Sequence, residues 1–298
     1  MKTETTNPAV RHDGVLLFDV VDGNPNGDPD SGNRPRIDEA TGHGLVTDVA
    51  IKRKIRDTIG ATATNLALDT DRYQIFVEAG HALNTRTAAS YTATGLTLGT
   101  KKLTEQDANT ARQWLCDRYI DIRLFGAVLS TGETRALGQI RGPLQFGMAR
   151  SIDPIQPVSH AITRVTQTRQ QDIDGGEKTE MGSKWTVPYG LYRAQFHYSA
   201  ALAGKTGVTT DDLTALYRTL LFMLDHDRTA TRGILTLRSL HVFSHSDAFG
   251  NAPAQPLLDR IKVERVTDTD TPRNFTDYKI STDLDNLPAG VTHDVLHQ

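Results

Sequence analysis

The sequence has little of several features that would indicate a particular class of protein. It contains one cysteine, Cys116, among 298 residues, so no intramolecular disulfide can form. A lone thiol is typical of a reducing compartment, and we therefore expect a cytoplasmic protein. Cys116 follows Trp114 and Leu115 in a predicted helix, which favours a buried structural thiol over a nucleophile.

Long hydrophobic runs are also missing. The longest apolar segments, such as Leu220–Leu224, are far shorter than the roughly 20 residues that span a bilayer. The first eleven residues are polar and lack the apolar stretch of a signal peptide. With 38% hydrophobic and 23% charged residues, the composition is that of a globular protein of one large or two small domains.

The net charge of −3 argues at first against a nucleic-acid partner. From Asp247 onward, however, nine acidic residues face five basic ones, which gives −4 there and leaves +1 for everything before it. Nucleic-acid binding depends on a local basic stripe rather than on the total charge. The net charge therefore excludes nothing.

The pattern of apolar residues predicts an α+β protein. A helix is expected from Thr47 or Asp48 to about Ile59, ended by Gly60. Further helices are expected at 104–119 and from Asp211 or Asp212 to about Leu224. Strands are expected at 15–21, 73–79, 121–129, 145–151, 191–198 and 233–243. Two strand–helix–strand units with a long interruption predict an RRM-like (ferredoxin-like) core with an antiparallel sheet.

We expect one such domain over residues 1–298, with three additions. A Thr/Gly/Ala-rich stretch at 85–100 indicates a finger-like insertion over 81–103. The segment 158–188 has strand character at both ends and a turn signal at 174–176, which predicts a protruding polar hairpin within 155–188. The tail, 250–298, is acidic and Pro-rich and carries weak signals of order.

A loop of turn-forming residues at 22–33 follows the first predicted strand. Its glycines let the backbone approach a ligand closely, and Asn24 and Asn26 can donate to phosphate or ribose oxygens. Arg34 and Arg36 follow the loop, and one basic helix edge comes next, formed by Lys52, Arg53 and Arg56. This favours a phosphate-binding surface, although an ordinary solvated loop remains an alternative.

Other chemistry fits less well. Asp22, Asn24 and Asn26 match an EF-hand calcium loop, but position twelve is Asn33 instead of glutamate and a strand precedes the loop. Lys205 belongs to a Gly-Lys-Thr triplet that resembles a nucleotide-binding loop, yet the required earlier glycine is Ser199.

Several other residues allow an enzymatic or base-stacking interpretation without demanding one. Asp28, Asp30 and His43 allow a nuclease site, whereas His241 and His245 are interpreted as surface or core histidines in preference to metal ligands. Aromatic residues of the later strands can stack bases, although such residues are more often core: Tyr189, Tyr192, Phe196 and Tyr198.

Several motifs in order along the chain resemble one family, the "Cas seven" backbone subunits of type I CRISPR surveillance complexes (Cascade) in the RAMP superfamily. They begin with Gly-Asn-Pro-Asn-Gly-Asp-Pro-Asp at 23–30, Pro35-Arg36 and the stretch from Thr47 to Arg56. They continue at 121–128, 140–146, 151–155, 162–164, 181–184 and 187–192. The chain length and the motif sequences are most similar to those of the type I-C branch, and next to those of type I-B.

The resemblance implies an RRM-like palm, inserted fingers and a thumb hairpin, here 155–188. Copies of such subunits assemble head to tail along one CRISPR RNA and leave its bases free to pair with a target DNA strand. The implied partners are further copies of the chain, the "Cas five" subunit, the large and small subunits and a recruited helicase-nuclease. Neither a catalytic role nor a cofactor is implied, so Asp28 and Asp30 are interpreted as loop-shaping residues.

A protein that holds any guide sequence should contact phosphate and ribose and leave the base edges free. The RNA-binding residues predicted on this basis come from the loop, the helix edge, the middle of the chain and the hairpin: Asn24, Asn26, Arg34, Arg36, Lys52, Arg53, Arg56, Arg141, Arg164 and Lys184.

Overall fold

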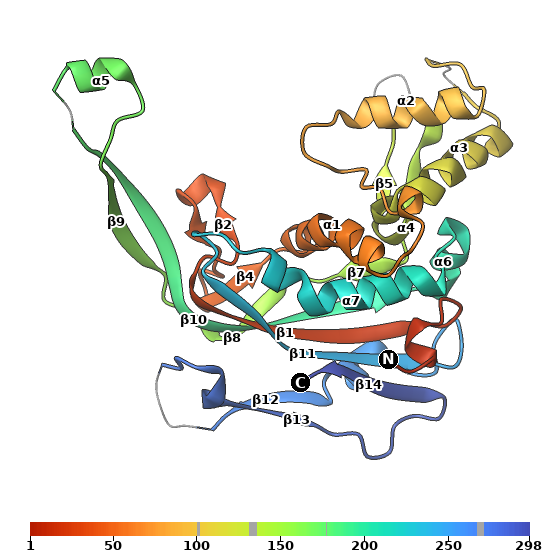
Figure 1. Cartoon of the computed structure of the whole chain (residues 1–298). Coiled ribbons are helices and arrows are strands. Elements are labelled where there is room, and N and C mark those ends of the chain that lie inside the picture. The colour runs from red at the N-terminus through yellow and green to blue at the C-terminus, as the bar shows by residue number, and fades with distance from the viewer. Residues whose placement is uncertain (100–101, 131–135, 177, 267–270) are drawn as a thin grey trace.

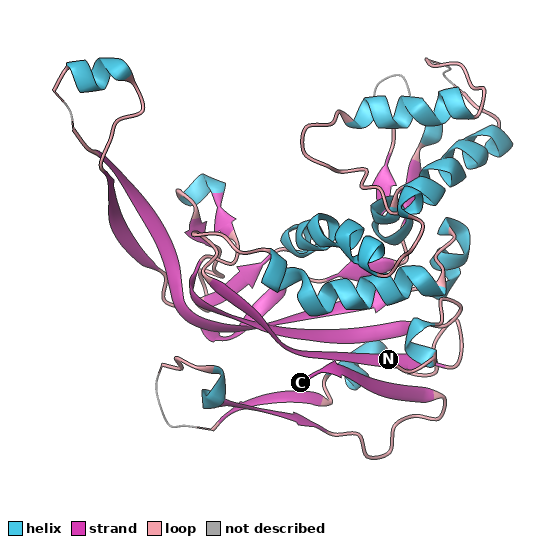
Figure 2. Ribbon diagram, viewed as in Figure 1, coloured by secondary structure: helices cyan, strands magenta, loops and turns pink. Residues whose placement is uncertain are grey.

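A large antiparallel sheet organises the molecule. The computed structural model describes residues 1–99, 102–130, 136–176, 178–266 and 271–298. The strand order is β14-β11-β1-β10-β8-β4, with β7 and β9 also paired to β10. The sheet separates a helical layer from a smaller layer formed by the C-terminal segment (Figures 1 and 2).

The central strand is β1 (His12–Gly23), which contains the predicted strand 15–21. It pairs with β10 (Glu180–Tyr198) on one side and β11 (Ile234–His245) on the other. Leu16 and Phe18 face the helices, while Val15 and Leu17 join a cluster on the opposite face. Both faces are covered, which explains why the strand is a continuous apolar run instead of an alternating one.

Two helices, α1 (Asp48–Asn65) and α7 (Thr210–His226), pack on one face of the sheet. The predicted start of α1 is confirmed, since Thr47 Oγ1 accepts from the Ala50 amide. The helix predicted to open at Asp211 or Asp212 begins slightly earlier, at Thr210, because Thr209 and Asp212 form a capping box. The predicted end of α1 at Gly60 is wrong. The helix continues because its next turn is also buried, with Thr219 Oγ1 donating to Thr62 Oγ1 over 3.0 Å.

The C-terminal segment covers the other face of the sheet, so the expectation of a weakly ordered tail is wrong. It contains α8 (Ala254–Leu258), β12 (Ile261–Arg265), β13 (Tyr278–Thr282) and the edge strand β14 (Val291–His297). Leu257, Leu258 and Ile261 pack against Leu17 and Phe243. Burial of these apolar side chains, spread thinly through a polar sequence, holds the segment in place.

A helical lobe with its own core stands beside the main layer. It contains α2 (Leu83–Ala93), α3 (Glu105–Arg118), α4 (Ile120–Phe125), β5 (Gly126–Val128) and β6 (Gln139–Arg141). The helix predicted at 104–119 is confirmed. The insertion predicted at 81–103 contains α2, and its residues 100–101 lie outside the described residues.

Two strands predicted in this region are wrong. Residues 73–79 make only an isolated bridge at Gln74, because the Phe76 and Val77 amides donate to the Asp121 carboxylate (2.7 and 3.0 Å). Residues 121–125 belong to α4, and only 126–128 are strand. The helical turn lets Arg123 reach Asp212 at the start of α7.

The predicted hairpin is confirmed as β9 (Val158–Arg164) paired with the first part of β10, and it projects from the sheet (Figure 1). The strand predicted at 191–198 is the far end of the same 19-residue strand. Residues 174–175 end a short helix, α5 (Gln170–Asp174), so the connection is longer than a tight turn. Residue 177 lies outside the described residues.

Short strands complete the sheet and its border. They are β2 (Gly27–Asp28), β3 (Arg34–Pro35), β4 (His43–Val46), β7 (Leu144–Phe146) and β8 (Ala149–Pro154), and α6 (Ala200–Thr206) follows β10. The single strand predicted at 145–151 is thus two strands, interrupted at 147–148. Within the described ranges, no helix is both long and apolar enough to cross a membrane.

Candidate nucleic-acid interface

The loop after β1 is a folded hairpin that side-chain hydrogen bonds hold in place. Asn24 is buried, and its Nδ2 donates to the Asn33 carbonyl over 2.7 Å. Asn26 Oδ1 accepts from both the amide and the hydroxyl of Thr47 (2.9 and 3.1 Å), which ties the loop to the start of α1. The side-chain amide of Asn24 therefore holds the loop, and its predicted contact with RNA stays a prediction.

Asp28 shapes the same loop, as expected. Its carboxylate accepts from the Asp30 amide over 3.2 Å and lies 3.4 Å from the Arg36 guanidinium. Gly27 is needed because a Cβ there would lie 1.9 Å from Asn33 Oδ1. The loop therefore presents Arg34 on β3, and Arg36 just after it, in a fixed position.

Arg34 and Arg36 lie where this loop meets the base of the β9–β10 hairpin. The Arg34 guanidinium lies 5.7 Å from the centre of the Trp185 ring, a cation–π contact. The Nε atoms of both arginines are buried, and neither has a hydrogen-bond partner in the described part of the chain. A buried donor without a partner costs about 1–3 kcal/mol, so an anionic ligand that accepts from it gains affinity.

The predicted basic edge of α1 is present, but each of its cations has a carboxylate partner. Lys52 pairs with Asp48 (3.1 Å) and also donates to Gln145. Arg53 pairs with Asp57 (2.8 Å) and is about half exposed. The edge is thus partly neutralised, which lowers its attraction for a polyanion.

Arg56, also predicted as an RNA contact, makes a buried ion pair within the protein. Its Nε donates to Asp121 over 2.8 Å, and the two side chains are 13% and 2% exposed. Asp121 in turn organises the segment around Phe76, so Arg56 holds α1 to the helical lobe. Lys54, which the pattern did not single out, makes a second buried ion pair of α1, with Asp227.

The two cations of the hairpin differ. Arg164 is exposed but forms an ion pair with Glu180 on the opposite strand, so it also fastens β9 to β10. Lys184 is half-buried near the base of the hairpin, beside Trp185 and opposite His160. Arg141 lies apart from both, exposed on β6 in the helical lobe.

The aromatic residues considered for base stacking are core. Tyr192, Phe196 and Tyr198 lie in the main cluster, and Tyr189 packs against Tyr278 beneath the C-terminal layer. Because α8, β12 and β13 cover that face of the sheet, its central strands cannot stack bases there. Trp185, by contrast, lies at the candidate interface beside Arg34.

A comparison with protein families decides the membership of the chain. A model of the family "CRISPR-associated protein Cas7" matches residues 10–283. The chain belongs to the Cas7 family. The family expected from the motifs is thus confirmed, and the match covers both the loop after β1 and the β9–β10 hairpin.

Individual relatives of this Cas7-family chain are distant. A CRISPR-associated protein Cas7 from Haloferax volcanii is 28% identical over 199 residues, which is 61% of this chain and 54% of the relative. The matched region thus spans about half the length of that relative.

Similar solved structures include a "CRISPR RNA-guided surveillance complex, pre-nicking" with 17% identity and a TM-score of 0.46, covering 79% of this chain and 78% of the other. Another is the "Type III-B Cmr-beta bound to cognate target RNA", with 13% identity and a TM-score of 0.41, covering 78% and 61%.

The alternative sites find little geometric basis in this Cas7-family chain. The side-chain oxygen of Asn26, Oδ1, a potential calcium ligand, accepts hydrogen bonds from Thr47. His43 Nδ1 lies 2.8 Å from the Ser151 carbonyl oxygen, which turns it to the sheet. Across the described residues, no group of three His, Cys, Asp or Glu side chains is placed to hold a metal ion.

The remaining titratable candidates are core residues, as predicted. Cys116 is buried, and its burial raises the pKa of the thiol to about 12, so it is not a nucleophile at neutral pH. His241 is fully buried with Nδ1 3.1 Å from His293 Nε2, and His245 Nε2 lies 3.0 Å from Asp13 Oδ2. These contacts explain the spacing of the two histidines without a metal.

Sequence reasoning missed the pairing of Arg34 with Trp185. Trp185 carries no local signal of function, because its partner lies far away in the sequence. Only the register of β10, with Gly23 opposite Val187, carries Trp185 to the end of β1 and the arginines beyond it. An aromatic residue at the predicted base of a hairpin was the one available hint.

Proposed function

We propose that this chain is a non-catalytic CRISPR RNA-binding backbone subunit of a type I surveillance complex, most similar to type I-C. Copies polymerise head to tail along the guide and present it to a target DNA strand. The other partners are the "Cas five", large and small subunits and a recruited helicase-nuclease. The protein works in the cytoplasm without a cofactor.

We also propose that the palm is RRM-like. The neighbouring strands β11, β1, β10 and β8, with α1 and α7 on one face, support this assignment. The β9–β10 hairpin is then the thumb, and the α2–α3 lobe provides the fingers. An open, non-closing contact between copies would give a filament whose length the RNA sets.

The observation that carries the proposal is that Arg34 on β3 and Arg36 just after it have buried Nε donors without a partner in the described part of the chain, with Arg34 beside Trp185. Guanidinium groups bind phosphate oxygens in a forked geometry, and an aromatic neighbour accepts a base or ribose without reading sequence. The site lies at the root of the hairpin, where a strand passing between hairpin and palm contacts both.

The test is recovery of RNA with the chain after expression beside a CRISPR array. Arg34→Ala with Arg36→Ala should reduce the recovered guide RNA at least tenfold. The slope of log K against log salt should fall by about 1.4, since two phosphate contacts are lost from a single strand.

A matched control removes two exposed cations elsewhere, Arg228→Ala with Lys279→Ala, and should leave RNA recovery unchanged. Equal RNA recovery by both double variants would count against the β3 site. Recovery of the unmodified chain as an RNA-free monomer would overturn the function itself.

Absence of catalysis needs its own experiment. Labelled single-stranded RNA should stay intact during long incubation with the purified chain and magnesium. Cleavage that stops with a chelator and with Asp28→Asn or Asp30→Asn would establish a metal-dependent ribonuclease instead.

A further inference from the structure

A second surface with the properties of a nucleic-acid site lies in the helical lobe, away from β3. Two clefts that share part of their lining lie along β6, and together they are called the β6 groove below. One part, of about 990 Å³, lies between α3, β6 and α6, and Trp114, Gln139 and Lys205 are among its lining residues. The other part, of about 460 Å³, runs from Phe125 to Gln145, and the two parts share Arg141 and Leu202.

The charge of the groove is opposite to that of the molecule. Its lining contains the cations Arg112, Arg141 and Lys205 and one carboxylate, Asp117, which gives +2, whereas the whole chain carries −3. Asp117 already accepts from Gln113 Nε2 over 3.0 Å. The lining therefore favours an anionic ligand.

The cations differ in their availability. Arg112 donates to Glu105 over 3.1 Å, at the outer rim of α3. Arg141 and Lys205 are exposed, and within the described residues neither has an ion-pair partner. Two cations that no carboxylate neutralises are thus the ones a ligand in the groove would meet.

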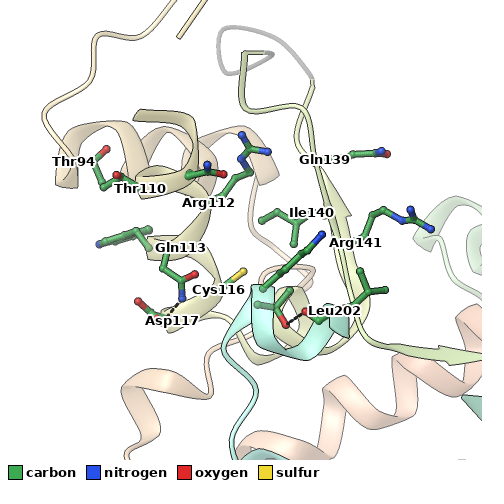
Figure 3. A pocket seen from close by; sticks show the side chains of 14 residues that line it. Thr94, Thr110, Arg112, Gln113, Cys116, Asp117, Gln139, Ile140, Arg141 and Leu202 are labelled. Atoms are coloured by element: carbon green, nitrogen blue, oxygen red, sulfur yellow. Dashed lines mark hydrogen bonds between the residues drawn. The ribbon is translucent and has the colours of Figure 1, made fainter. Parts of the chain in front are cut away.

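Their placement indicates the kind of anion. Figure 3 shows Arg112 on α3 and Arg141 on the far side of β6, with the Arg141 side chain extending away from α3. The guanidinium groups do not converge on one point, so the groove suits several separated charges rather than a single phosphate ion. The lining also contains two amide side chains, Gln113 and Gln139, and the Trp114 ring, which can stack on a base.

The groove also leads to the interface described above. Gln145, which lines its second part, accepts a hydrogen bond from Lys52 near the start of α1 over 3.3 Å. An extended polyanion in the groove would therefore reach the N-terminal part of α1.

We propose that the β6 groove binds the sugar-phosphate backbone of a single-stranded nucleic acid, with Arg141 and Lys205 as phosphate contacts. The choice of nucleic acid over other polyanions rests on the proposed function. The ligand is thus a second stretch of strand, separate from the one held by Arg34 and Arg36.

The two tryptophans of the chain allow each surface to be measured by itself, because Trp114 lines the groove and Trp185 lies at the β3 site. Trp185→Phe leaves Trp114 as the sole tryptophan reporter, and Trp114→Phe leaves Trp185. Each full-length variant is titrated with an eight-nucleotide oligouridylate and with the oligodeoxythymidylate of equal length, at low salt. Trp114 fluorescence should change saturably with at least one of the two strands.

Arg141→Glu with Lys205→Glu, in the Trp185→Phe background, should weaken the Trp114 response at least tenfold. Both side chains are exposed, so the fold is not at risk. The matched control, Lys262→Glu with Lys279→Glu on β12 and β13, makes the same change of charge elsewhere and should keep the response. If both double variants weaken the Trp114 response equally, the effect comes from the change of net charge, and the proposed site is wrong.

The remaining outcomes are distinguishable. A response of Trp185 without one of Trp114 would overturn the groove and leave the proposed function standing. Silence of both reporters with both strands would contradict the proposed function as well. An equal Trp114 response to an eight-residue oligoglutamate would assign the groove to acidic peptides instead.

Discussion

At the scale of single residues, buried charges decide how the parts of this molecule are joined. Arg123 and Asp212 are both completely buried, and Nε and Nη2 of the arginine donate to the two carboxylate oxygens over 2.9 and 2.8 Å. Asp212 also accepts from the Thr209 amide at the start of α7. One carboxylate therefore joins the helical lobe to the main helix layer and caps α7.

Replacing Arg123 by methionine should lower the free energy of unfolding by about 3–5 kcal/mol, because the buried Asp212 loses its partner. The measurement is urea denaturation followed by circular dichroism. Arg228→Met removes an exposed pair with Asp225 and should cost under about 1 kcal/mol. If both variants lose a similar amount of unfolding free energy, the buried Arg123–Asp212 pair contributes no more to stability than an exposed pair.

At the scale of elements, the β9–β10 hairpin is built differently from the rest of the sheet. Every residue of β9 is exposed, and β9 pairs only with β10. Even its apolar residues Val158 and Ile162 are exposed, since neither face of the hairpin has a layer to pack against. The hairpin therefore contributes little to the core.

Replacing residues 160–184 by Asn-Gly should therefore change the free energy of unfolding by less than about 1 kcal/mol while abolishing RNA-dependent assembly. Ser159 and Trp185 are opposite one another, so a two-residue turn closes the shortened hairpin. Denaturation curves and size-exclusion chromatography with guide RNA measure the two effects.

A milder variant, with only residues 170–176 replaced by Asn-Gly, keeps Arg164 and Lys184 and serves as the comparison. Normal assembly of the variant that lacks residues 160–184 would exclude the hairpin from contacts between copies and with RNA.

At the scale of the whole molecule, histidines buried on both sides of the sheet make stability depend on pH. Burial lowers the pKa of His12 and of His241 to about 4. His12 bonds Ser244 and Asn7, and His241 faces His293, whose pKa burial also lowers. All three side chains are therefore held neutral in the folded protein.

The contribution of these histidines to the free energy of unfolding should be complete above pH 6.5 and should fall as the pH drops from 6.5 toward 4. In that window the unfolded chain binds protons that the folded chain does not. Each of His12 and His241 contributes a slope of up to about 1.4 kcal/mol per pH unit. Asp19 acts in the opposite direction, because burial raises its pKa.

Urea denaturation at a series of pH values measures this slope, which His241→Leu should reduce. A stability that does not change between pH 6.5 and 4.5 would contradict the neutral state of these histidines.

The sequence by itself determined the elements with strong local signals. Thr47 begins α1 because a side-chain cap acts within one turn, and β1 follows from an apolar run that ends in turn-forming residues. The hairpin and the family also followed from local pattern and motif order. All ten residues predicted as RNA contacts remain predictions: Asn24, Asn26, Arg34, Arg36, Lys52, Arg53, Arg56, Arg141, Arg164 and Lys184.

The tertiary structure decided what depends on partners distant in sequence. Asp121 accepts a hydrogen bond from the Phe76 amide, so residues 73–79 do not form a strand, and it pairs with Arg56. No local sequence pattern indicates these contacts. Scattered leucines of the C-terminal segment became a covering layer only because Val15 and Leu17 lay exposed beneath them. Hydrophobic burial and ion pairing depend on distance in space rather than in sequence. Only the folded chain therefore shows which Arg and Lys side chains are exposed, which are buried in ion pairs, and where the β6 groove lies.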